Sequence, residues 1–471
     1  MMIFVLPFPY VTMGLLAMLL GAIFCSPRFP RINNRRVGLS LLSFTLLMLL
    51  FALVKLQWQK IASYPDPLLP QFKVDAVDGL PLVVFLFVVI IAVCLAPRRD
   101  IRERCLSGIF LLVMGTTMIY ASDHLWIVNV GWWLNCVPFV GAFFGKTPDR
   151  KQTSVMLMAS AILLTLSTAF LHASQWASVE TITQWSMFFF VATLIVRKGL
   201  FPFHGWTLQS FEKGPLLPKA VLFNSHLGAL LVLRAQSSGM SVLEHPSLEW
   251  LSLLALVTAL ITSLRGLIEK KPRRLMAFVC ISQASFILSG LLATNAEGVM
   301  GGMLHWAVVA LASTSLIAIV RILEVRVIDV ADPTASLGLA VRAPRLAVFF
   351  LLSGLALVGL PGTMGYCAED LLFHGVQDHH SVMGVALLLA TAINAINLMR
   401  LYSVLFLGVL PKNVIEVPDA LPRERWPLTV LVVLLVMGGL YPRWPIALRQ
   451  EAVKAIPLRV NDLPHHADGL H

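Results

Sequence analysis

The amino-acid sequence predicts an all-α polytopic membrane protein, and three observations lead to that fold class. Of the 471 residues, 58% are hydrophobic and only 13% are charged, whereas soluble domains average about 45–50% apolar and about 25% charged residues. Apolar runs long enough to cross a bilayer as helices follow one another along the chain. Gly and Pro interrupt two of these runs beside ionisable residues. The composition excludes a soluble globular enzyme.

The apolar runs predict about fourteen transmembrane helices, since each has about the 20 residues that a spanning helix needs. The first run is interpreted as a retained span rather than a signal peptide, because no basic segment precedes it and Arg28 and Arg31 follow it. One or two of the later runs are expected to be split or tilted. In chain order the runs lie near residues 3–25, 37–56, 79–96, 106–120, 124–144, 155–171, 182–200, 219–237, 248–267, 275–294, 299–322, 343–376, 381–408 and 427–442.

Basic residues gather in alternate loops, which is typical of loops on the cytoplasmic side. They follow spans 1, 3, 5, 7, 9, 11 and 13, whereas the loops between these hold few or none. Both termini are therefore predicted on the non-cytoplasmic side of the cell (inner) membrane, although Arg443, Arg449, Lys454 and Arg459 near the C-terminus do not fit this pattern. The basic loops hold Arg28, Arg31, Arg35, Arg36, Arg98, Arg99, Arg102, Arg104, Lys146, Arg150, Lys151, Lys213, Lys219, Lys270, Lys271, Arg273, Arg274, Arg321, Arg326, Arg342, Lys412, Arg423 and Arg425.

Most of the formal net charge of +11 lies in these loops, so no nucleic-acid partner is predicted. The six cysteines are scattered singly without zinc or iron–sulfur spacing and are interpreted as buried small hydrophobes. No GxGxxG or GxxxxGK[ST] motif is present, so neither a cofactor such as NADH, flavin or ATP nor a catalytic residue is predicted. The tail histidines His465, His466 and His471 lack ligand spacing, so no metal site is predicted.

The first interrupted run is VRKGLFPFHGW, residues 196–206. Arg197 and Lys198 end an apolar helix, Pro202 breaks it by removing a backbone donor, and His204 follows. Ionisable groups in a membrane cost about 2.5–3.5 kcal/mol on insertion scales and usually face a protein interior or a wet path. A break of this kind typically lines an ion or substrate site. The alternative is a basic pair that snorkels to the cytoplasmic surface.

The second interrupted run is GLPGTMGYCAEDLLFHG, residues 359–375, where the break at Pro361 precedes Glu369, Asp370 and His374. A carboxyl group buried in a membrane helix can switch between its neutral and charged forms when a cation approaches or leaves. Because a proton relay requires that behaviour, these residues are candidates for one. For Asp370, a helix-end position facing the lipid headgroups is the alternative.

Two further histidines, His226 and His305, lie in the middle of predicted spans. Imidazole titrates near neutral pH and hydrogen-bonds through both nitrogens, so a row of histidines, lysines and carboxylates can pass protons through ordered water. For each histidine alone, the alternative is a residue that only packs. The predicted row at the membrane midplane is Lys198, His226, His305 and Glu369.

The interrupted runs are spans 7 and 12, and their odd separation of five spans reverses the orientation of the second relative to the first. This spacing predicts two inverted five-helix repeats, spans 4–8 and 9–13, each with one broken helix. Four regions follow. They are residues 1–105 with helices 1–3, 106–240 with the first repeat, 241–410 with the second repeat, and 411–471 with the last helix and a short tail.

Four segments resemble the antiporter-like membrane subunits of respiratory complex I, Mrp cation/proton antiporters, membrane-bound hydrogenases and the inorganic-carbon pumps called DAB. VDAVDGLPLVVFL (74–86) resembles the VDGLS segment of this superfamily, and PFHGWTLQSFEKGP resembles its P-[LF]-H-x-W loop. RRLMAFVCISQASFIL and GLALVGLPGTMGYCAED resemble two of its helix motifs. The resemblance covers nearly the whole chain.

The resemblance implies roles for individual residues. Arg197 stands where the superfamily usually has the lysine of its first broken helix, and Lys198 beside it is the expected substitute. His226 falls at or near the central lysine or histidine of helix 8. His305 matches a helix-11 histidine, and Glu369 matches the terminal glutamate or lysine of helix 12.

The largest departure from the superfamily lies in WWLNCVPF, residues 132–139. Trp133 stands where helix 5 normally carries a glutamate, and Asn135 cannot replace a charge. Arginine remains charged, so Arg197 can act as an electrostatic partner but not as a switching proton carrier. The paired-charge switch that the resemblance implies is therefore incomplete.

The resemblance implies a proton- or cation-translocating subunit of a multi-subunit energy-coupled complex, working with other membrane subunits or a cytoplasmic partner protein. One form is a translocase subunit of the NADH–quinone oxidoreductase type. HGWTLQSFE (204–212) is closer to the inorganic-carbon pumps, whose membrane subunits work with a cytoplasmic zinc protein resembling carbonic anhydrase. The further alternatives are a Na⁺/H⁺ antiporter subunit and a non-conducting scaffold, which Trp133 and Arg197 favour and Lys198 and Glu369 oppose.

Overall fold

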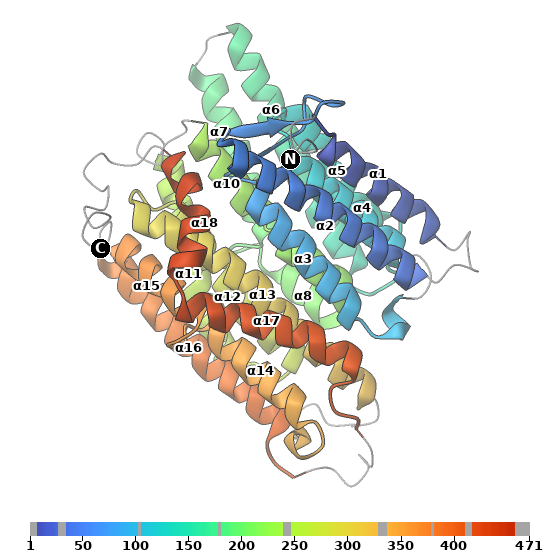
Figure 1. Cartoon of the computed structure of the whole chain (residues 1–471). Helices are drawn as coiled ribbons and strands as arrows, with labels where there is room; N and C mark the ends of the chain where they lie inside the picture. The colour runs from blue at the N-terminus through green and yellow to red at the C-terminus, as the bar shows by residue number, and fades with distance from the viewer. Residues whose placement is uncertain are drawn as a thin grey trace. The chain divides into compact units, whose positions relative to one another are not determined.

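The computed structural model describes residues 7–26, 34–101, 105–177, 180–238, 246–327, 337–377, 381–409 and 417–456. Figure 1 colours them from blue near the N-terminus to red near the C-terminus. Several of the residues on which the topology prediction depends lie outside this described part. They are Arg28, Arg31, Arg102, Arg104, Lys412 and Arg459, together with the tail histidines His465, His466 and His471.

The described residues are mostly helical, as the composition predicts. Short 3₁₀ turns and one two-stranded hairpin complete the secondary structure of this part of the chain. In order, the elements are α1 (Tyr10–Phe24), α2 (Asn34–Gln59), β1 (Ser63–Pro65), β2 (Lys73–Asp75), α3 (Gly79–Leu95), η2 (Arg98–Ile101), α4 (Cys105–Tyr120), α5 (Leu125–Val140), α6 (Arg150–Ala177), α7 (Glu180–Lys198), α8 (Gly205–Lys213), α9 (Leu216–Asn224), α10 (Leu227–Ser237), α11 (Pro246–Ile268), α12 (Pro272–Leu291), α13 (Ala296–Arg326), η3 (Leu339–Val341), α14 (Pro344–Leu357), α15 (Met364–Gln377), α16 (Ser381–Phe406), α17 (Pro422–Leu440) and α18 (Arg443–Lys454).

The chain divides into two units, and each is described by itself. The four regions predicted from the sequence, with repeats at 106–240 and 241–410, stay a prediction. Unit 1 comprises Met1–Gly228, Ile317–Ile328 and Leu421–Pro427, and unit 2 comprises Ala229–Leu316, Asp329–Ala420 and Leu428–His471.

Unit 1 is built from helix pairs that are neighbours in sequence, with α1 on α2, α4 on α5 and α6 on α7 (Figure 1). Helices α4 and α5 approach closely because each has a glycine at the contact, Gly115 on α4 and Gly131 on α5. A Cβ added at Gly115 would lie 2.6 Å from the carbonyl oxygen of Gly131, and one at Gly131 would lie 2.7 Å from that of Gly115. The hairpin pairs Ser63 with Asp75 in antiparallel register between α2 and α3.

Unit 2 packs α11, α12, α15 and α16 against one another. Helix α12 is buried on every side, with each residue from Leu275 to Leu291 inside the protein, although Gln283 and three serines interrupt its apolar sequence. Part of the core lies where α11, α12, α15 and α16 meet. It is formed by Leu256, Ala259, Phe286, Leu372, Val376, Leu387 and Ala390.

Within the described residues, seven helical stretches are long and apolar enough to cross a membrane when α9 and α10 are counted together as Leu216–Ser237, or eight if α17 and α18, bent by 82°, form one span. Five shorter apolar helices accompany them in this part of the chain. Each of the apolar runs expected from the sequence coincides with one or more helices. The helical, polytopic fold class is confirmed, while fourteen spans and the inverted repeats stay predictions.

Helix breaks follow the sequence-based expectation with one addition. Residues 199–204 separate α7 from α8, and residues 358–363 separate α14 from α15, at the two Gly/Pro segments. The run near 219–237, expected as a continuous span with His226 in its middle, is also broken, between α9 and α10. This break occurs because the backbone of His226 has a φ of 42°, in the left-handed region that ends an α-helix.

Candidate functional site

The end of α7 positions two cationic side chains, Arg197 and Lys198, in its last turn. Gly199, with a φ of 65°, supplies the left-handed residue that commonly terminates a helix. Trp206 of α8 donates its indole N–H to the backbone carbonyl of Val196 at 3.0 Å. The interrupted helix lacks some of its regular backbone hydrogen bonds at this point, and the Trp206 side chain supplies a donor to one of the affected carbonyls.

The break between α9 and α10 is held in the same way by a neighbouring helix. Tyr120 of α4 donates its hydroxyl proton to the backbone carbonyl of Ser225 at 2.8 Å. His226, which follows, is only 2% exposed and packs its ring edge-on against Phe223. The buried imidazole therefore lies at the break between α9 and α10 rather than on the face of a continuous helix.

These two breaks bring Lys198 and His226 together. The Nζ atom of Lys198 lies 3.3 Å from Nδ1 of His226. Gly228 makes the approach possible, since a Cβ there would lie 2.6 Å from Cγ of Lys198. The ammonium can donate to the imidazole when Nδ1 carries no proton, and transfer along this contact yields a neutral amine and an imidazolium.

Arg197 points to a different set of partners on α5. Its guanidinium lies 4.9 Å from the ring of Trp132, and its Nη2 lies 3.5 Å from Oδ1 of Asn135. Trp133, which the resemblance aligns with the family glutamate, is instead 37% exposed and donates its indole N–H to Thr165. Adjacent residues of a helix point about 100° apart, so Trp132 faces the protein interior while Trp133 faces outward. Arg197 therefore contacts Trp132 and Asn135 and not Trp133.

Glu369, His305 and Gln283 form the corresponding cluster of unit 2. The Nε2 atom of His305 lies 3.1 Å from the backbone carbonyl of Gln283. With its amide nitrogen turned toward these acceptors, the Gln283 side chain donates to His305 Nε2 at 3.0 Å and to Glu369 Oε1 at 3.3 Å. Gln283 therefore links the acid to the imidazole and offers a partner to either tautomer of His305.

The break between α14 and α15 shapes the surroundings of Glu369. Gly359 has a φ of 72°, and a Cβ at this position would collide with the Glu369 carboxylate. The glycine is therefore required both by its backbone conformation and by the close approach of the acid. Glu369 itself is 9% exposed, and His305 is fully buried.

The other predicted residues of the two breaks lie elsewhere. Asp370 and His374 are exposed on α15 and approach each other at 3.8 Å, away from the buried face that carries Glu369. His204 stacks on Phe201 in the turn before α8. The sequence grouped these residues with the buried ones because it shows proximity along the chain but not which side of a helix faces inward.

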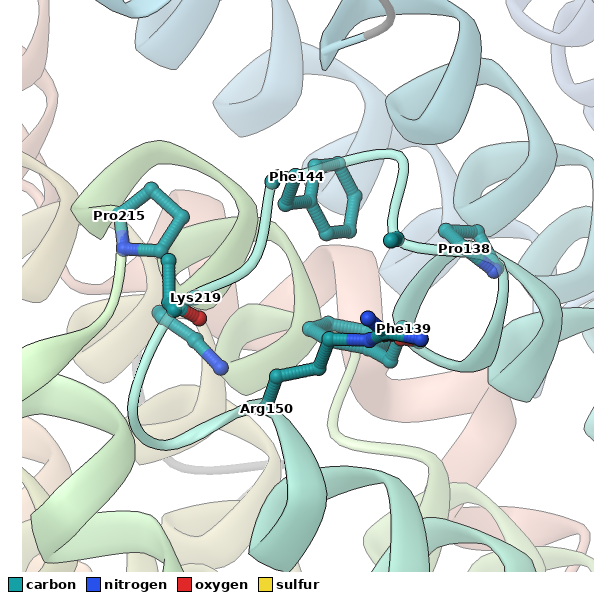
Figure 2. Close-up of a pocket in the computed structure, with 9 residues that line it drawn as sticks. Pro138, Phe139, Phe144, Arg150, Pro215 and Lys219 are labelled. Carbon is teal, nitrogen blue, oxygen red and sulfur yellow. Dashed lines mark hydrogen bonds between the residues drawn. The ribbon is translucent and has the colours of Figure 1, made fainter.

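A buried ion pair in unit 1 was missed by the sequence-based analysis, which treated Lys219 as a loop residue. Lys219 on α9 donates to Asp149 Oδ2 at 2.7 Å, and both side chains are at most 3% exposed. A cavity of about 10 Å³, close to the space one water needs, is lined by Lys219, Pro215, Phe139 and Arg150 (Figure 2). Nothing in the spacing of Asp149 and Lys219 signals the pair, since 70 residues separate them.

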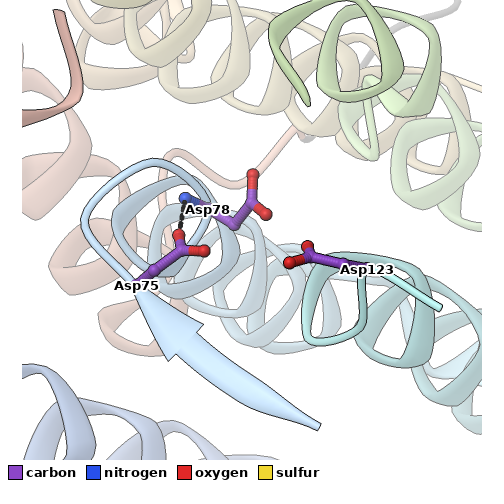
Figure 3. A group of neighbouring side chains, drawn as sticks. All are labelled: Asp75, Asp78 and Asp123. Carbon is purple, nitrogen blue, oxygen red and sulfur yellow. Dashed lines mark hydrogen bonds between the residues drawn. The ribbon is translucent and has the colours of Figure 1, made fainter. Parts of the chain in front are cut away.

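Three carboxylates of unit 1, Asp75, Asp78 and Asp123, have oxygen atoms within 4.8 Å of one another (Figure 3). Asp75 accepts the backbone N–H of Asp78 at 2.8 Å. Lys73 pairs with Asp123 and with Asp75. Burial lowers the pKa of Lys73, but the hydrogen bond and charge of Asp123, aided by Asp75, outweigh it and raise that pKa above its usual value. A lysine ammonium thus balances part of this negative charge, and we assign the cluster a structural role.

The fold and these clusters define a polytopic membrane protein with ionisable side chains buried at broken helices. Residues 151–394, just over half of the chain, match the family of NADH:quinone oxidoreductase and Mrp antiporter transmembrane proteins. The chain belongs to this family. The resemblance seen in the sequence motifs is thereby confirmed.

The chain is 27% identical over 273 residues to NADH-quinone oxidoreductase subunit M of Rickettsia bellii, covering 56% of this chain and 53% of that one. It thus spans about half the length of the curated relatives it matches. A chain of respiratory complex I from Thermus thermophilus has the same fold, with a TM-score of 0.78 and 19% identity over 95% of this chain and 100% of that one. A chain of the Mrp complex from Dietzia sp. DQ12-45-1b has a TM-score of 0.78 and 16% identity over 95% and 97%.

Proposed function

We propose that this chain is a proton-translocating membrane subunit of an energy-coupled complex of the NADH–quinone oxidoreductase type. The observation that carries the proposal is that each unit holds two linked ionisable groups, buried or half-buried, of which at least one lies beside a helix break. Lys198 contacts His226 in unit 1, and Gln283 links Glu369 to His305 in unit 2. Buried ionisable groups in membrane proteins are costly and mark ion or proton pathways.

The proposed transfer uses Lys198 and His226 as one exchanging pair and His305 and Glu369 as the other. Lysine, imidazole and carboxyl groups can each lose and regain a proton, whereas the guanidinium of Arg197 stays charged and serves only as a fixed positive charge. We also propose that protons pass through the two pairs in one pathway, in the order of the row predicted from the sequence. The proposal assigns no transfer step to His204, Asp370 or His374, the last two of which are exposed on α15.

Partner subunits are also proposed. Asp370 and His374 have exposed fractions of 53% and 57% on an otherwise largely apolar helix. An ionisable pair facing lipid would carry the insertion cost of charged side chains in a membrane, which contact with another membrane subunit removes. We place the protein in the inner membrane, with about fourteen spans in two inverted repeats and both termini on the non-cytoplasmic side.

An inorganic-carbon pump remains the second candidate, favoured by the HGWTLQSFE stretch at 204–212. The relatives and structures named above carry the names of a quinone oxidoreductase, a respiratory complex and an Mrp complex. We therefore rank the oxidoreductase type ahead of the carbon pump. A large carbonic-anhydrase-like protein copurifying from native membranes would reverse this order.

The test is proton uptake into proteoliposomes that contain the native complex, measured with a pH-sensitive dye. Glu369→Gln removes the exchangeable proton and keeps the shape, so uptake is expected to fall at least tenfold, or about 1.4 kcal/mol in barrier. Glu297→Gln, the same substitution at an exposed site on α13, is the matched control and is expected to leave uptake unchanged. Equal uptake by the Glu369 variant and the parent would refute the proposal.

A further inference from the structure

Among the side chains that the structure describes, no carboxylate pairs with the buried cation Arg197. Arg197 is only 7% exposed, and its Nη1 atom has no hydrogen-bond partner among the described residues. Its guanidinium contacts the Trp132 ring and the amide oxygen of Asn135. Both are neutral groups, so they orient the guanidinium without cancelling its charge.

Such an arrangement is unfavourable unless something else supplies negative charge. Removing an ion from water costs several kcal/mol, and a nearby opposite charge normally offsets that cost. Lysine or histidine could release a proton instead, but a guanidinium cannot. The next residue, Lys198, adds a second cationic side chain, and its contact is the imidazole of His226 rather than a carboxylate.

The neighbouring residues hold one side of this site firmly. Asn135 donates its amide N–H to the carbonyl of Gly131 at 3.0 Å, and Thr116 donates its hydroxyl to Asn135 Oδ1 at 3.4 Å. The amide oxygen is therefore fixed toward Arg197 by the close α4–α5 contact. Trp132, fully buried, covers the guanidinium with its ring.

We infer that Arg197 binds a small monovalent inorganic anion, such as a halide or bicarbonate, between α5 and α7. The anion accepts from the guanidinium at Nη1 and supplies the single negative charge that the described side chains lack around this residue. A monovalent anion fits because one guanidinium charge has to be balanced in an apolar setting that disfavours a dianion. The presence of the anion does not depend on whether the chain translocates protons.

The experiment measures thermal unfolding of the purified full chain in lipid nanodiscs, with sodium gluconate replaced stepwise by sodium chloride, bromide or bicarbonate at constant ionic strength. A ligand that binds only the folded state raises the unfolding midpoint as its concentration passes its Kd. We expect a rise of roughly 2–4 °C for the parent. The salt that produces it at the lowest concentration identifies the anion, and the absence of any anion-specific rise overturns the inference.

Asn135→Asp is the decisive variant, because it places a carboxylate 3.5 Å from the guanidinium while retaining Arg197. It should abolish the anion response, and Arg197→Gln should abolish it too. Asn129→Asp is the matched control, since Asn129 is buried on the same helix but bonds to Leu125 and Thr168. That variant should keep the response. An Asn135→Asp protein that responds to the anion as the parent does contradicts the site.

Discussion

The two units differ in the sign of the charge that each places beside a Gly/Pro helix break. Unit 1 places Arg197 and Lys198 beside amide, indole and imidazole groups. Unit 2 places one acid, Glu369, beside Gln283 and His305. Among the described residues, no glutamate pairs with the cations at the end of α7, as the superfamily resemblance would imply, so their positive charge must be balanced otherwise.

The units also differ in where their ionisable groups lie relative to the helix breaks. In unit 1 both members of the pair stand at helix breaks, at the end of α7 and between α9 and α10. In unit 2 only Glu369 lies beside a break, whereas Gln283 and His305 lie within the continuous helices α12 and α13. The unit 1 pair therefore depends on local backbone geometry, and the unit 2 cluster depends on a side-chain bridge.

The largest effect of a single change in unit 1 is expected for Lys198→Met. Methionine keeps the length and apolar character of the chain but cannot carry a proton to His226, so uptake into proteoliposomes should fall at least tenfold, equivalent to about 1.4 kcal/mol. Lys213→Met, an exposed lysine at the end of α8, is the matched control. If both variants pump equally, the contact at 3.3 Å has no part in transport.

A smaller loss is expected in unit 2 for Gln283→Leu. Leucine fills a similar volume but removes the amide that bridges His305 and Glu369, and a lost hydrogen bond of about 1 kcal/mol corresponds to roughly fivefold slower uptake. Gln184→Leu, at an exposed position on α7, serves as the comparison. Unchanged uptake by Gln283→Leu would show that water, not this side chain, connects the two groups.

Gly228→Ala tests the dependence of unit 1 on close packing. The added methyl group would lie 2.6 Å from Cγ of Lys198, so the lysine has to shift away from His226 and uptake should fall a fewfold. Gly205→Ala adds a methyl group where nothing lies within 4 Å and is expected to be silent. The two variants together separate displacement of Lys198 from any general effect of alanine on these helices.

The smallest effect is expected outside the membrane spans, for Lys73→Met in the hairpin of unit 1. Partly exposed ion pairs contribute about 0–1 kcal/mol, so the midpoint of unfolding should change little at neutral pH. Because the folded-state pKa of Lys73 is raised, its contribution is present below the ordinary lysine pKa and is lost as the pH rises through the raised value. The parent and variant should therefore begin to converge in stability above about pH 10.5 and converge fully only above the raised pKa, and a constant difference would contradict the assignment.

The fold class could be predicted from the sequence because each helix that spans a membrane requires about 20 consecutive, mostly apolar residues. Apolar runs of span length located the helices, and Gly199 with Pro202 and Gly359 with Pro361 located two breaks. The break at His226 could not be foreseen, since no glycine or proline stands there and a positive φ at histidine is uncommon.

The sequence nominates candidate site residues but not their contacts. Lys198, His226, His305 and Glu369 are candidates because ionisable groups are costly in a span, because imidazole titrates near neutral pH and because of the family resemblance, yet a sequence does not show which neighbour each one meets. The resemblance aligned Trp133 with the missing acid, while packing places Trp132 against Arg197. The sequence does not single out Gln283, because a glutamine that bridges two ionisable groups has the same sequence signal as one that merely bonds between helices.

The most direct test of a single proton pathway through both units is the combination of Lys198→Met with Glu369→Gln. Proton uptake by proteoliposomes of the native complex would be measured for the parent, both single variants and the double variant. If the two pairs act in series in one pathway, removing the second pair has little left to remove, and the double variant should pump as slowly as the slower single variant. A double variant slowed by the product of the two single effects would contradict one shared pathway.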